Sequence, residues 1–429
     1  MKKLRRLLGQ CGPGIISGAG NDDPSCIVSY SIVGAMFGYS TLWTSLFALP
    51  LIASLQMMSA RLGLVSGRGL AGAARTAWSP LIVVPLCCLL AVANIVTLGA
   101  DLGGMADVTS MITGLPSGVW TIVYAAGIVA LLFYLPYGKI ENIFKWLCMV
   151  LFAYVIAGVL ARPDWTAVIA NTLVPRVSWS REYLSTLVAI IGATVSPYFL
   201  FWQTSQEVEN QVCLGRHSVA ERRGATGEDL ERVHVDVIAG STISKLIAYF
   251  ITITTAATLF ANGKTDIATA QEAAASLEPF AGDAARLLFA AGVIGTVLLA
   301  IPVLAGSCAY AWPEAMRWRA SLIDQPAQAP NFYIVIGLSV AVGLGLLAAG
   351  LHVVDMLFWA SVMNGLLAPL CILAVLLLTG DPKLMGNRRN GLWLQTMGWI
   401  AFVVSGGCDA GELFGFTLVT ETSGSLGSL

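Results

Sequence analysis

The interpretation of this chain starts from residues 18–25, which read GAGNDDPS. They interrupt an otherwise apolar run from about residue 12 to residue 37. A charge at the centre of a bilayer costs about 2.5–3.5 kcal/mol on insertion scales, so the paired acids Asp22 and Asp23 indicate a functional site. Pro24 lacks an N–H group, so we expect the helix to unwind there and expose carbonyls to a cation or a polar substrate.

The composition indicates a membrane protein. Of the 429 residues, 56% are hydrophobic and only 11% are charged, and the mean hydropathy is +0.76. These values exclude a water-soluble globule and predict one transmembrane domain over residues 1–429. The net charge of −1 and the lack of a basic tract give no indication of a nucleic-acid partner. The nine cysteines are an odd number and lie mostly in apolar segments, so a disulfide framework is not expected.

Apolar stretches of roughly 20 residues predict eleven transmembrane helices. They cover about residues 12–37, 42–63, 80–112, 117–137, 142–162, 184–211, 234–261, 284–312, 331–350, 353–379 and 391–409. We expect residues 263–283 to form a short surface helix. Of the 24 lysines and arginines, eighteen fall at the N-terminus and in the loops after the even-numbered spans. This asymmetry predicts a multi-pass cell-membrane protein with a cytoplasmic N-terminus and an outside C-terminus.

A second interruption, GATVSP at residues 192–197, falls inside the sixth span. It matches the position of the first interruption if residues 12–162 and 184–379 form two repeats, with 391–409 as an additional helix. Either interruption alone could be a packing kink. Two in register are typical of an inverted-repeat transporter whose site lies near the middle of the membrane. Carboxylates, carbonyls and hydroxyls there would suit Mg²⁺, Mn²⁺ or Ca²⁺.

Four stretches resemble the natural resistance-associated macrophage protein (NRAMP) divalent-metal transporters. They are Gly12-Pro13-Gly14, Asp23-Pro24, ARLGLVSG at residues 60–67 and GATV at residues 192–195. The resemblance covers most of the first ten spans. It implies an all-α polytopic fold of about eleven helices in the leucine-transporter arrangement, a 5+5 inverted repeat with helices 1 and 6 broken. It also implies transport by alternating access, with the ion bound between the two unwound segments.

The resemblance implies a metal site at Asp23, Cys26, Ala193 and Ser196. The metal-binding Asn of the family falls on Cys26, its metal-binding carbonyl on Ala193 and its methionine thioether on Ser196. Because a thioether favours transition metals, the Ser196 hydroxyl removes discrimination against Mg²⁺ and Ca²⁺, whereas a Cys26 thiol facing the ion would favour softer metals. Asp22 is an additional acid that would suit a partly hydrated ion. The pattern is most similar to the NRAMP-related magnesium transporters.

The resemblance also concerns proton coupling. Asp101 stands where the family has an aspartate, but Gly104 replaces a glutamate and Tyr198 replaces a histidine. A tyrosine of ordinary pKa does not exchange protons readily near neutral pH, so the usual relay is incomplete. Asp101 could belong to another relay or be a structural partner of neighbouring polar groups.

Three further polar residues are possible site or pathway residues. Ser25 replaces the glycine of the family's first-helix motif. Gln203 follows the second interruption and could line an exit path or make a contact between helices. Asn364 falls where the family has a glutamine that closes around the ion.

We therefore expect a transporter of divalent cations, chiefly Mg²⁺ and also Mn²⁺, without tight proton coupling. We expect no cofactor, nucleic acid or obligate protein partner. The alternative is a proton-coupled Mn²⁺/Fe²⁺ symporter of the ordinary NRAMP type. A cation-coupled symporter of a small solute is disfavoured because the paired acids would repel a carboxylate substrate. An enzyme is disfavoured because the three histidines are not spaced as a metal motif.

Overall fold

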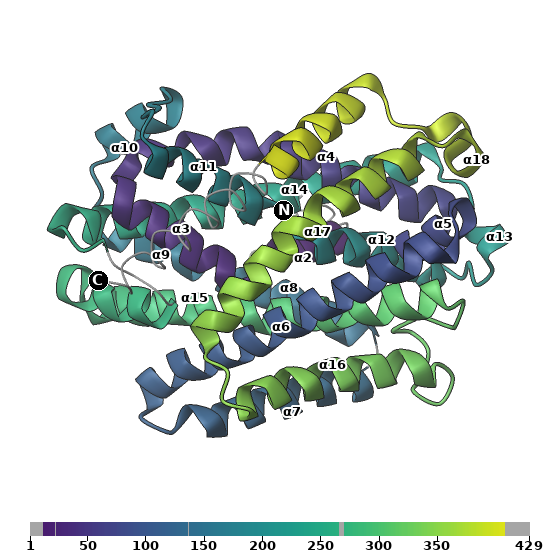
Figure 1. Cartoon of the computed structure of the whole chain (residues 1–429), viewed down its shortest axis with the longest axis horizontal. Coiled ribbons are helices and arrows are strands. Elements are labelled where there is room, and N and C mark those ends of the chain that lie inside the picture. Colours follow the sequence, from purple (N-terminus) through teal and green to yellow (C-terminus); the bar gives the residue numbers. More distant parts are fainter. Residues whose placement is uncertain (1–11, 22, 136, 266–269, 408–429) are drawn as a thin grey trace, which may run out of the picture.

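The computed structural model of the chain describes residues 12–21, 23–135, 137–265 and 270–407, and every regular element in these ranges is a helix (Figure 1). The α-helices are α2 (Pro13–Ala19), α3 (Pro24–Phe37), α4 (Trp43–Ser66), α5 (Leu70–Ala77), α6 (Pro80–Thr113), α7 (Ser117–Tyr134), α8 (Tyr137–Val150), α9 (Phe152–Leu160), α10 (Trp165–Leu173), α11 (Arg181–Thr194), α12 (Pro197–Cys213), α13 (Val219–Arg222), α14 (Gly227–Thr258), α15 (Ala270–Ala315), α16 (Pro330–Ala348), α17 (Val353–Gly380) and α18 (Pro382–Met385). Short 3₁₀ helices are η1 (Gly38–Thr41), η2 (Phe260–Asn262) and η3 (Gly386–Arg388). Residues 392–407 are also helical.

The helices account for the predicted spans. Within the described residues, eight helices are long and apolar enough to cross a bilayer. The remaining three predicted spans are helical but interrupted or shorter: α2 and α3 share the first, α11 and α12 share the sixth, and residues 392–407 form the last. The predicted all-helical fold class with broken helices 1 and 6 is confirmed.

The expectation of a separate surface helix over residues 263–283 is wrong. Residues from Ala270 onward belong to α15, a single helix of 46 residues. At 1.5 Å per residue this helix is about 69 Å long, more than twice the hydrocarbon core of a bilayer, so it extends beyond the membrane. The alanine-rich start is a good helix former and continues into the apolar span, and Pro279 does not end the helix.

The first half-helix, α2, is fixed against α14 by glycines and by a carboxylate. A Cβ atom on Gly18 would lie 2.4 Å from the carbonyl carbon of Gly240, so the two backbones approach more closely than any larger residue permits. Asp236 of α14 accepts hydrogen bonds from the N–H groups of Gly12 at 2.9 Å and Gly14 at 2.6 Å. These bonds satisfy donors that the first turn of α2 would otherwise leave unpaired.

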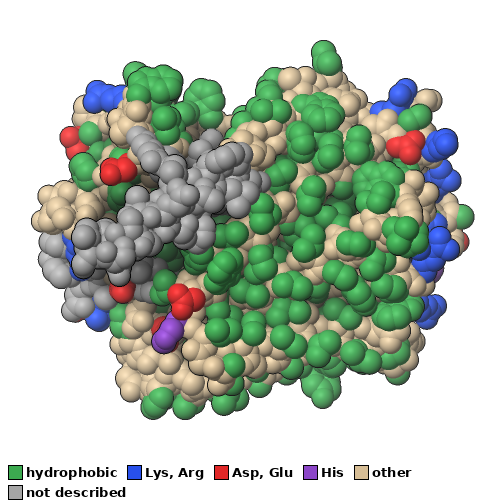
Figure 2. Space-filling model, viewed as in Figure 1, with side chains coloured by type: hydrophobic (Ala, Val, Ile, Leu, Met, Phe, Trp, Pro, Cys, Tyr) green, Lys and Arg blue, Asp and Glu red, His purple; other side chains and the backbone are tan. Residues whose placement is uncertain are grey.

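The two ends of the helical bundle differ in charge. Hydrophobic side chains cover most of the middle of the face in Figure 2, and lysines and arginines gather mainly at one end. Figure 1 places α5, α13 and α18 at that end. We call it the basic end, and its charged residues include Arg68, Arg75, Arg222, Arg223, Arg317, Arg319, Lys383, Arg388 and Arg389. That it faces the cytoplasm stays a prediction from charge asymmetry.

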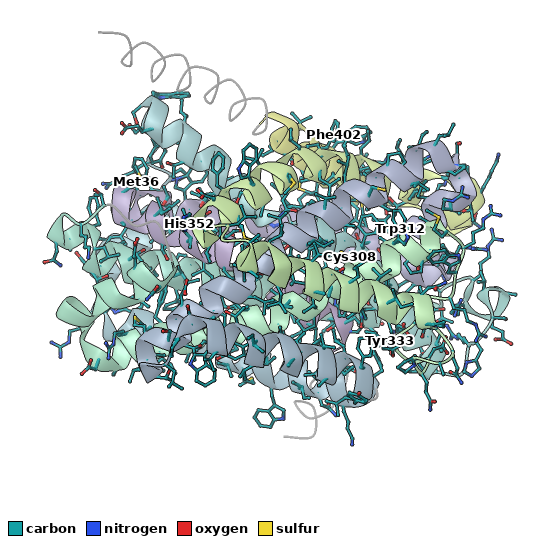
Figure 3. All side chains as sticks on the ribbon, turned by 60° about the horizontal axis from the view of Figure 1, so that its bottom comes forward. Met36, Cys308, Trp312, Tyr333, His352 and Phe402 are labelled. Carbon is teal, nitrogen blue, oxygen red and sulfur yellow. The ribbon has the colours of Figure 1, made fainter. Side chains whose placement is uncertain are left out.

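Successive helices run between these ends. Figure 3 shows Met36, near the end of α3, and His352, just before α17, at one end of the molecule. Trp312, near the end of α15, and Tyr333, near the start of α16, lie at the opposite end. Asp23 and Ser196, at the two helix breaks, are buried.

Candidate metal-ion site

The first helix break lies between α2 and α3. Gly20 is the C-cap of α2 and Pro24 begins α3, so the carbonyl of Gly20 cannot receive the helical hydrogen bond from residue 24. Asp23 is the N-cap of α3 and is 1% exposed. Its carboxylate accepts a hydrogen bond from the N–H of Cys26 at 3.1 Å and another from the hydroxyl of Ser25. The break therefore presents a buried carboxylate beside a freed carbonyl.

The second break lies between α11 and α12. Thr194 ends α11, Ser196 is the N-cap of α12 and Pro197 is its first residue. Pro197 has no N–H group, so the carbonyl of Ala193 has no helical donor, as at the first break. This carbonyl is the group for which the family resemblance implies metal binding. The side chain of Ala193 lies outside the described part of the structure.

Asn21 joins the two breaks. Its amide Nδ2 donates to the carbonyl of Thr194 at 3.0 Å, and its Oδ1 accepts from the N–H of Ser196 at 3.3 Å. The Ser196 hydroxyl donates in turn to the carbonyl of Asn21 at 3.3 Å. Our sequence analysis gave Asn21 no role, although an amide next to paired acids in an apolar run was an available signal. The buried bridge holds the two unwound segments together.

Tyr198, in the first turn of α12, faces the first break. Its hydroxyl lies 3.2 Å from the carbonyl oxygens of both Gly20 and Asn21 and 3.4 Å from Oδ2 of Asp23. A phenol has a single proton and can donate to only one of these acceptors at a time. The other oxygens keep lone pairs that a cation can use.

Asp101 brings a second carboxylate from α6. It is completely buried, and neither of its oxygens has a hydrogen-bond partner within the described ranges. Asp23 and Tyr198 are near enough for its charge to act on both of them. A buried carboxylate without partners is costly, so a cation or a proton is expected to neutralise it.

Cys26 and Asp22 are the two remaining residues of the predicted first-helix site. The Sγ atom of Cys26 lies 3.9 Å from the carbonyl oxygen of Asn21, so the buried thiol faces the break. Asp22 lies outside the described residues, and its role stays a prediction.

Gln203 and Asn364 bond elsewhere. Gln203 donates to Glu207 at 3.0 Å and accepts from Gln56 of α4 at 3.1 Å, which is a contact between helices. Asn364 of α17 donates to Thr97 of α6 at 3.3 Å, one helical turn before Asp101. No hydrogen bond within the described ranges joins either side chain to the breaks. Their roles in the pathway stay predictions.

The groups around the breaks include oxygen atoms of the kind that bind a hard cation. They comprise the carboxylates of Asp23 and Asp101, the carbonyls of Gly20 and Ala193 and the hydroxyl of Ser196. The carboxyl ends of α2 and α11 add the negative ends of two helix dipoles. Among the described residues no three His, Cys, Asp or Glu side chains cluster as metal ligands. An ion would therefore need backbone oxygens or water as well as carboxylate.

Comparisons with known proteins agree with this geometry. Residues 14–414 match the family described as natural resistance-associated macrophage protein-like. The divalent metal cation transporter MntH of Ralstonia nicotianae is 30% identical over 416 residues, which cover 93% of this chain and 89% of that protein.

Two solved structures share the fold. A manganese transporter of Eremococcus coleocola superposes with a TM-score of 0.73 at 20% identity, over 95% of this chain and 86% of that one. MHP1, a nucleobase-cation-symport-1 family transporter in a closed conformation, superposes with a TM-score of 0.59 at 14% identity, over 92% of this chain and 91% of that one.

Proposed function

The chain belongs to the natural resistance-associated macrophage protein-like family, and on this premise we propose that it carries divalent metal cations across a membrane by alternating access. One observation carries the proposal: two broken helices meet at Asn21, around the buried carboxylate of Asp23, with the buried carboxylate of Asp101 within electrostatic reach. Freed backbone oxygens next to intramembrane acids are what a transported cation requires in place of its hydration shell. The chain is a transporter and not an enzyme.

The transported ions in this proposal are Mn²⁺ and Mg²⁺. The names of the relatives favour Mn²⁺ over our first expectation of Mg²⁺, since the Eremococcus protein is a manganese transporter and the Ralstonia protein is named MntH. Carboxylate, carbonyl and water ligands suit both ions. Ser196 supplies a hydroxyl at the second break, and a hydroxyl does not favour softer metals over Mg²⁺. We therefore expect both ions to be carried, with weak discrimination between them.

We further propose that transport is not tightly coupled to protons. Tyr198 directs its hydroxyl at two carbonyls and a carboxylate, and glycine at position 104 has no side chain to titrate. A membrane potential that is negative inside favours the influx of a dication by about 4.6 kcal/mol per 100 mV, so a coupled proton is not required for accumulation. We also propose that the basic end faces the cytoplasm. The two structural repeats of the transporter would be residues 12–162 and 184–379.

The test is uptake into proteoliposomes that contain the purified protein. Influx of Mn²⁺ and Mg²⁺ is measured with metal-sensitive dyes while an internal dye reports pH. We expect both ions to enter under a negative-inside potential without acidification. Mn²⁺ influx with acidification and without Mg²⁺ influx would support the proton-coupled alternative instead. If a folded preparation carries neither ion, the proposed function is contradicted.

A further inference from the structure

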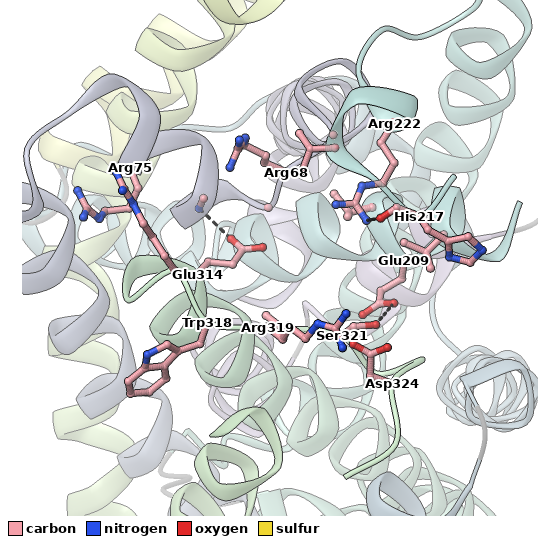
Figure 4. Close-up of a pocket in the computed structure, with 18 of the residues that line it drawn as sticks. Arg68, Arg75, Glu209, His217, Arg222, Glu314, Trp318, Arg319, Ser321 and Asp324 are labelled. Atoms are coloured by element: carbon pink, nitrogen blue, oxygen red, sulfur yellow. Dashed lines mark hydrogen bonds between the residues drawn. The ribbon is translucent and has the colours of Figure 1, made fainter. Parts of the chain in front are cut away.

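A polar cavity lies at the basic end, away from the residues of the helix breaks. It has a volume of about 680 Å³ and is lined by α5, the ends of α12 and α15, the segment around α13 and the loop after α15 (Figure 4). Five arginines line it: Arg68, Arg75, Arg222, Arg317 and Arg319. A cavity of this size accommodates a small organic ligand.

The acids of this cavity are bound to the protein itself. Glu314 accepts a hydrogen bond from the N–H of Gly72 at 2.9 Å, and a Cβ on Gly69 would lie 2.1 Å from its carboxylate, so it caps the start of α5. Glu209 accepts from the N–H of Leu322 at 2.6 Å and from the hydroxyl of Tyr310 at 2.8 Å. These carboxylates have structural partners other than the arginines.

The cavity arginines contrast with neighbouring arginines that do have acidic partners. Arg216 pairs with Asp229 at 3.6 Å, and Arg232 pairs with Glu207 at 3.9 Å. None of the five cavity arginines has a carboxylate oxygen within 4.0 Å in the part of the chain that the structure describes.

The arginine contacts that are present are few and go to backbone. Arg222 donates to the carbonyl of His217 at 3.3 Å, while its Nε atom is buried and has no hydrogen-bond partner within the described residues. Arg75 donates to the carbonyl of Ala315 at 2.9 Å. Most of the guanidinium N–H groups around the cavity are therefore left for a ligand.

The charge balance identifies the class of ligand. Five guanidinium groups face three lining acids, the third being Asp324, and an imidazole from His217 lies among them. A divalent cation would be repelled from such a cavity, so it is not suited to be the exit for a metal. A planar guanidinium instead matches the paired oxygens of a phosphate group.

We propose that this cavity binds a phosphate-bearing anion, either a soluble phosphorylated small molecule or the headgroup of an anionic lipid. The arginines come from α5 and the loop before it, from α13 and from the loop after α15, so a bound phosphate connects three separate segments of the basic end. A ligand that binds only the folded state raises thermal stability, and the rise grows with the logarithm of ligand concentration once that concentration exceeds the Kd. This proposal does not depend on metal transport.

The test uses the full chain in neutral detergent with pyrophosphate as the soluble probe. Binding is measured by titration calorimetry and by the shift in melting temperature. The variant Arg68→Gln/Arg222→Gln removes two guanidinium groups from the cavity. Arg223→Gln is the matched control, because Arg223 is next in sequence, exposed and bonded to the carbonyl of Lys383 outside the cavity lining. Arg317→Gln/Arg319→Gln is a second pair in case the first fails to fold.

We expect saturable pyrophosphate binding that both double variants weaken by about tenfold or more and the control leaves unchanged. For the lipid source, the chain is placed in nanodiscs of phosphatidylcholine with or without phosphatidylglycerol, and retained lipid is measured by mass spectrometry. Retention of phosphatidylglycerol that is lost in the double variants, without pyrophosphate binding, would support the headgroup as ligand. The proposal is overturned if the wild type binds neither probe, or if the folded double variants bind as the wild type does.

Discussion

The helix breaks and the basic end both bury carboxylates, but they differ in what surrounds those carboxylates. At the breaks, Asp101 has no hydrogen-bond partner and Asp23 has short local donors but no arginine or lysine within 4.0 Å, in the described residues. At the basic end, Glu209 and Glu314 accept hydrogen bonds from backbone N–H groups, and none of the five cavity arginines has a carboxylate oxygen within 4.0 Å among the described residues.

Buried carboxylates therefore have two different roles in one molecule. A carboxylate that lacks a compensating charge attracts a cation to its site. At the basic end, the carboxylates of Glu209 and Glu314 hold chain segments in place among five arginines, and because the arginines outnumber the acids, positive charge is left for other ligands. In our two proposals, the same residue types serve a cation site at the helix breaks and an anion cavity at the basic end.

The largest expected effect on metal uptake comes from removing the charge of Asp23 at the first helix break. Asp23→Asn keeps an N-cap side chain for α3 but removes the charge, so Mn²⁺ and Mg²⁺ uptake should fall by at least about 100-fold. Uptake into proteoliposomes is the measurement. Asp164→Asn is the matched control, because Asp164 also caps a helix, accepting from the N–H of Thr166 at 3.0 Å, and lies away from the breaks. Equal uptake by Asp23→Asn and the control would remove the site assignment.

A smaller loss is expected at the second carboxylate. Asp101→Asn should lower Mn²⁺ uptake by about tenfold, because weakening the attraction for a dication by about 1.4 kcal/mol already reduces affinity by that factor. Asp107→Asn, on the same helix and only partly buried, is the control and should retain uptake. If the two variants transport alike, Asp101 is a structural residue and the comparison rests on Asp23 alone.

Much of this arrangement could be predicted from sequence because its signals are local. Pro24 and Pro197 each remove a helical N–H, and hydropathy marks the spans within a single stretch of chain. The bridge made by Asn21 could not be predicted, since it joins residues 173 positions apart. The arginine cavity could not be predicted either, because its arginines come from α5 and the loop before it, from α13 and from the loop after α15. The length of α15 could not be predicted either. A glycine or proline near an alanine-rich stretch does not show whether that stretch forms its own helix or continues into the next transmembrane helix.

The choice of ion can be shifted at the second break. Ser196→Met places a thioether where a hydroxyl lies 3.3 Å from the carbonyl of Asn21, and sulfur favours transition metals. The ratio of Mn²⁺ to Mg²⁺ uptake, measured in competition, should rise about five- to tenfold. Ser196→Ala removes the hydroxyl without adding sulfur and should leave the ratio near that of the wild type. A similar rise in both variants would mean that lost hydrogen bonding, and not sulfur, changes selectivity.

The smallest effect on transport is expected at the basic end. Removing the charge of Glu314 there should change protein stability and anion binding but not metal uptake. Glu314→Gln keeps an oxygen that can accept from the N–H of Gly72 but removes the charge at the start of α5, which should lower stability by about 0.5–1 kcal/mol. Metal uptake should stay within about twofold of the wild type, and pyrophosphate should bind a few-fold more tightly because one of three cavity acids has lost its charge. Calorimetry, melting temperature and uptake on the same preparation separate these effects. A loss of metal uptake as large as that of Asp23→Asn would show that the two regions are one pathway, and the distinction between a cation site and an anion cavity would fail.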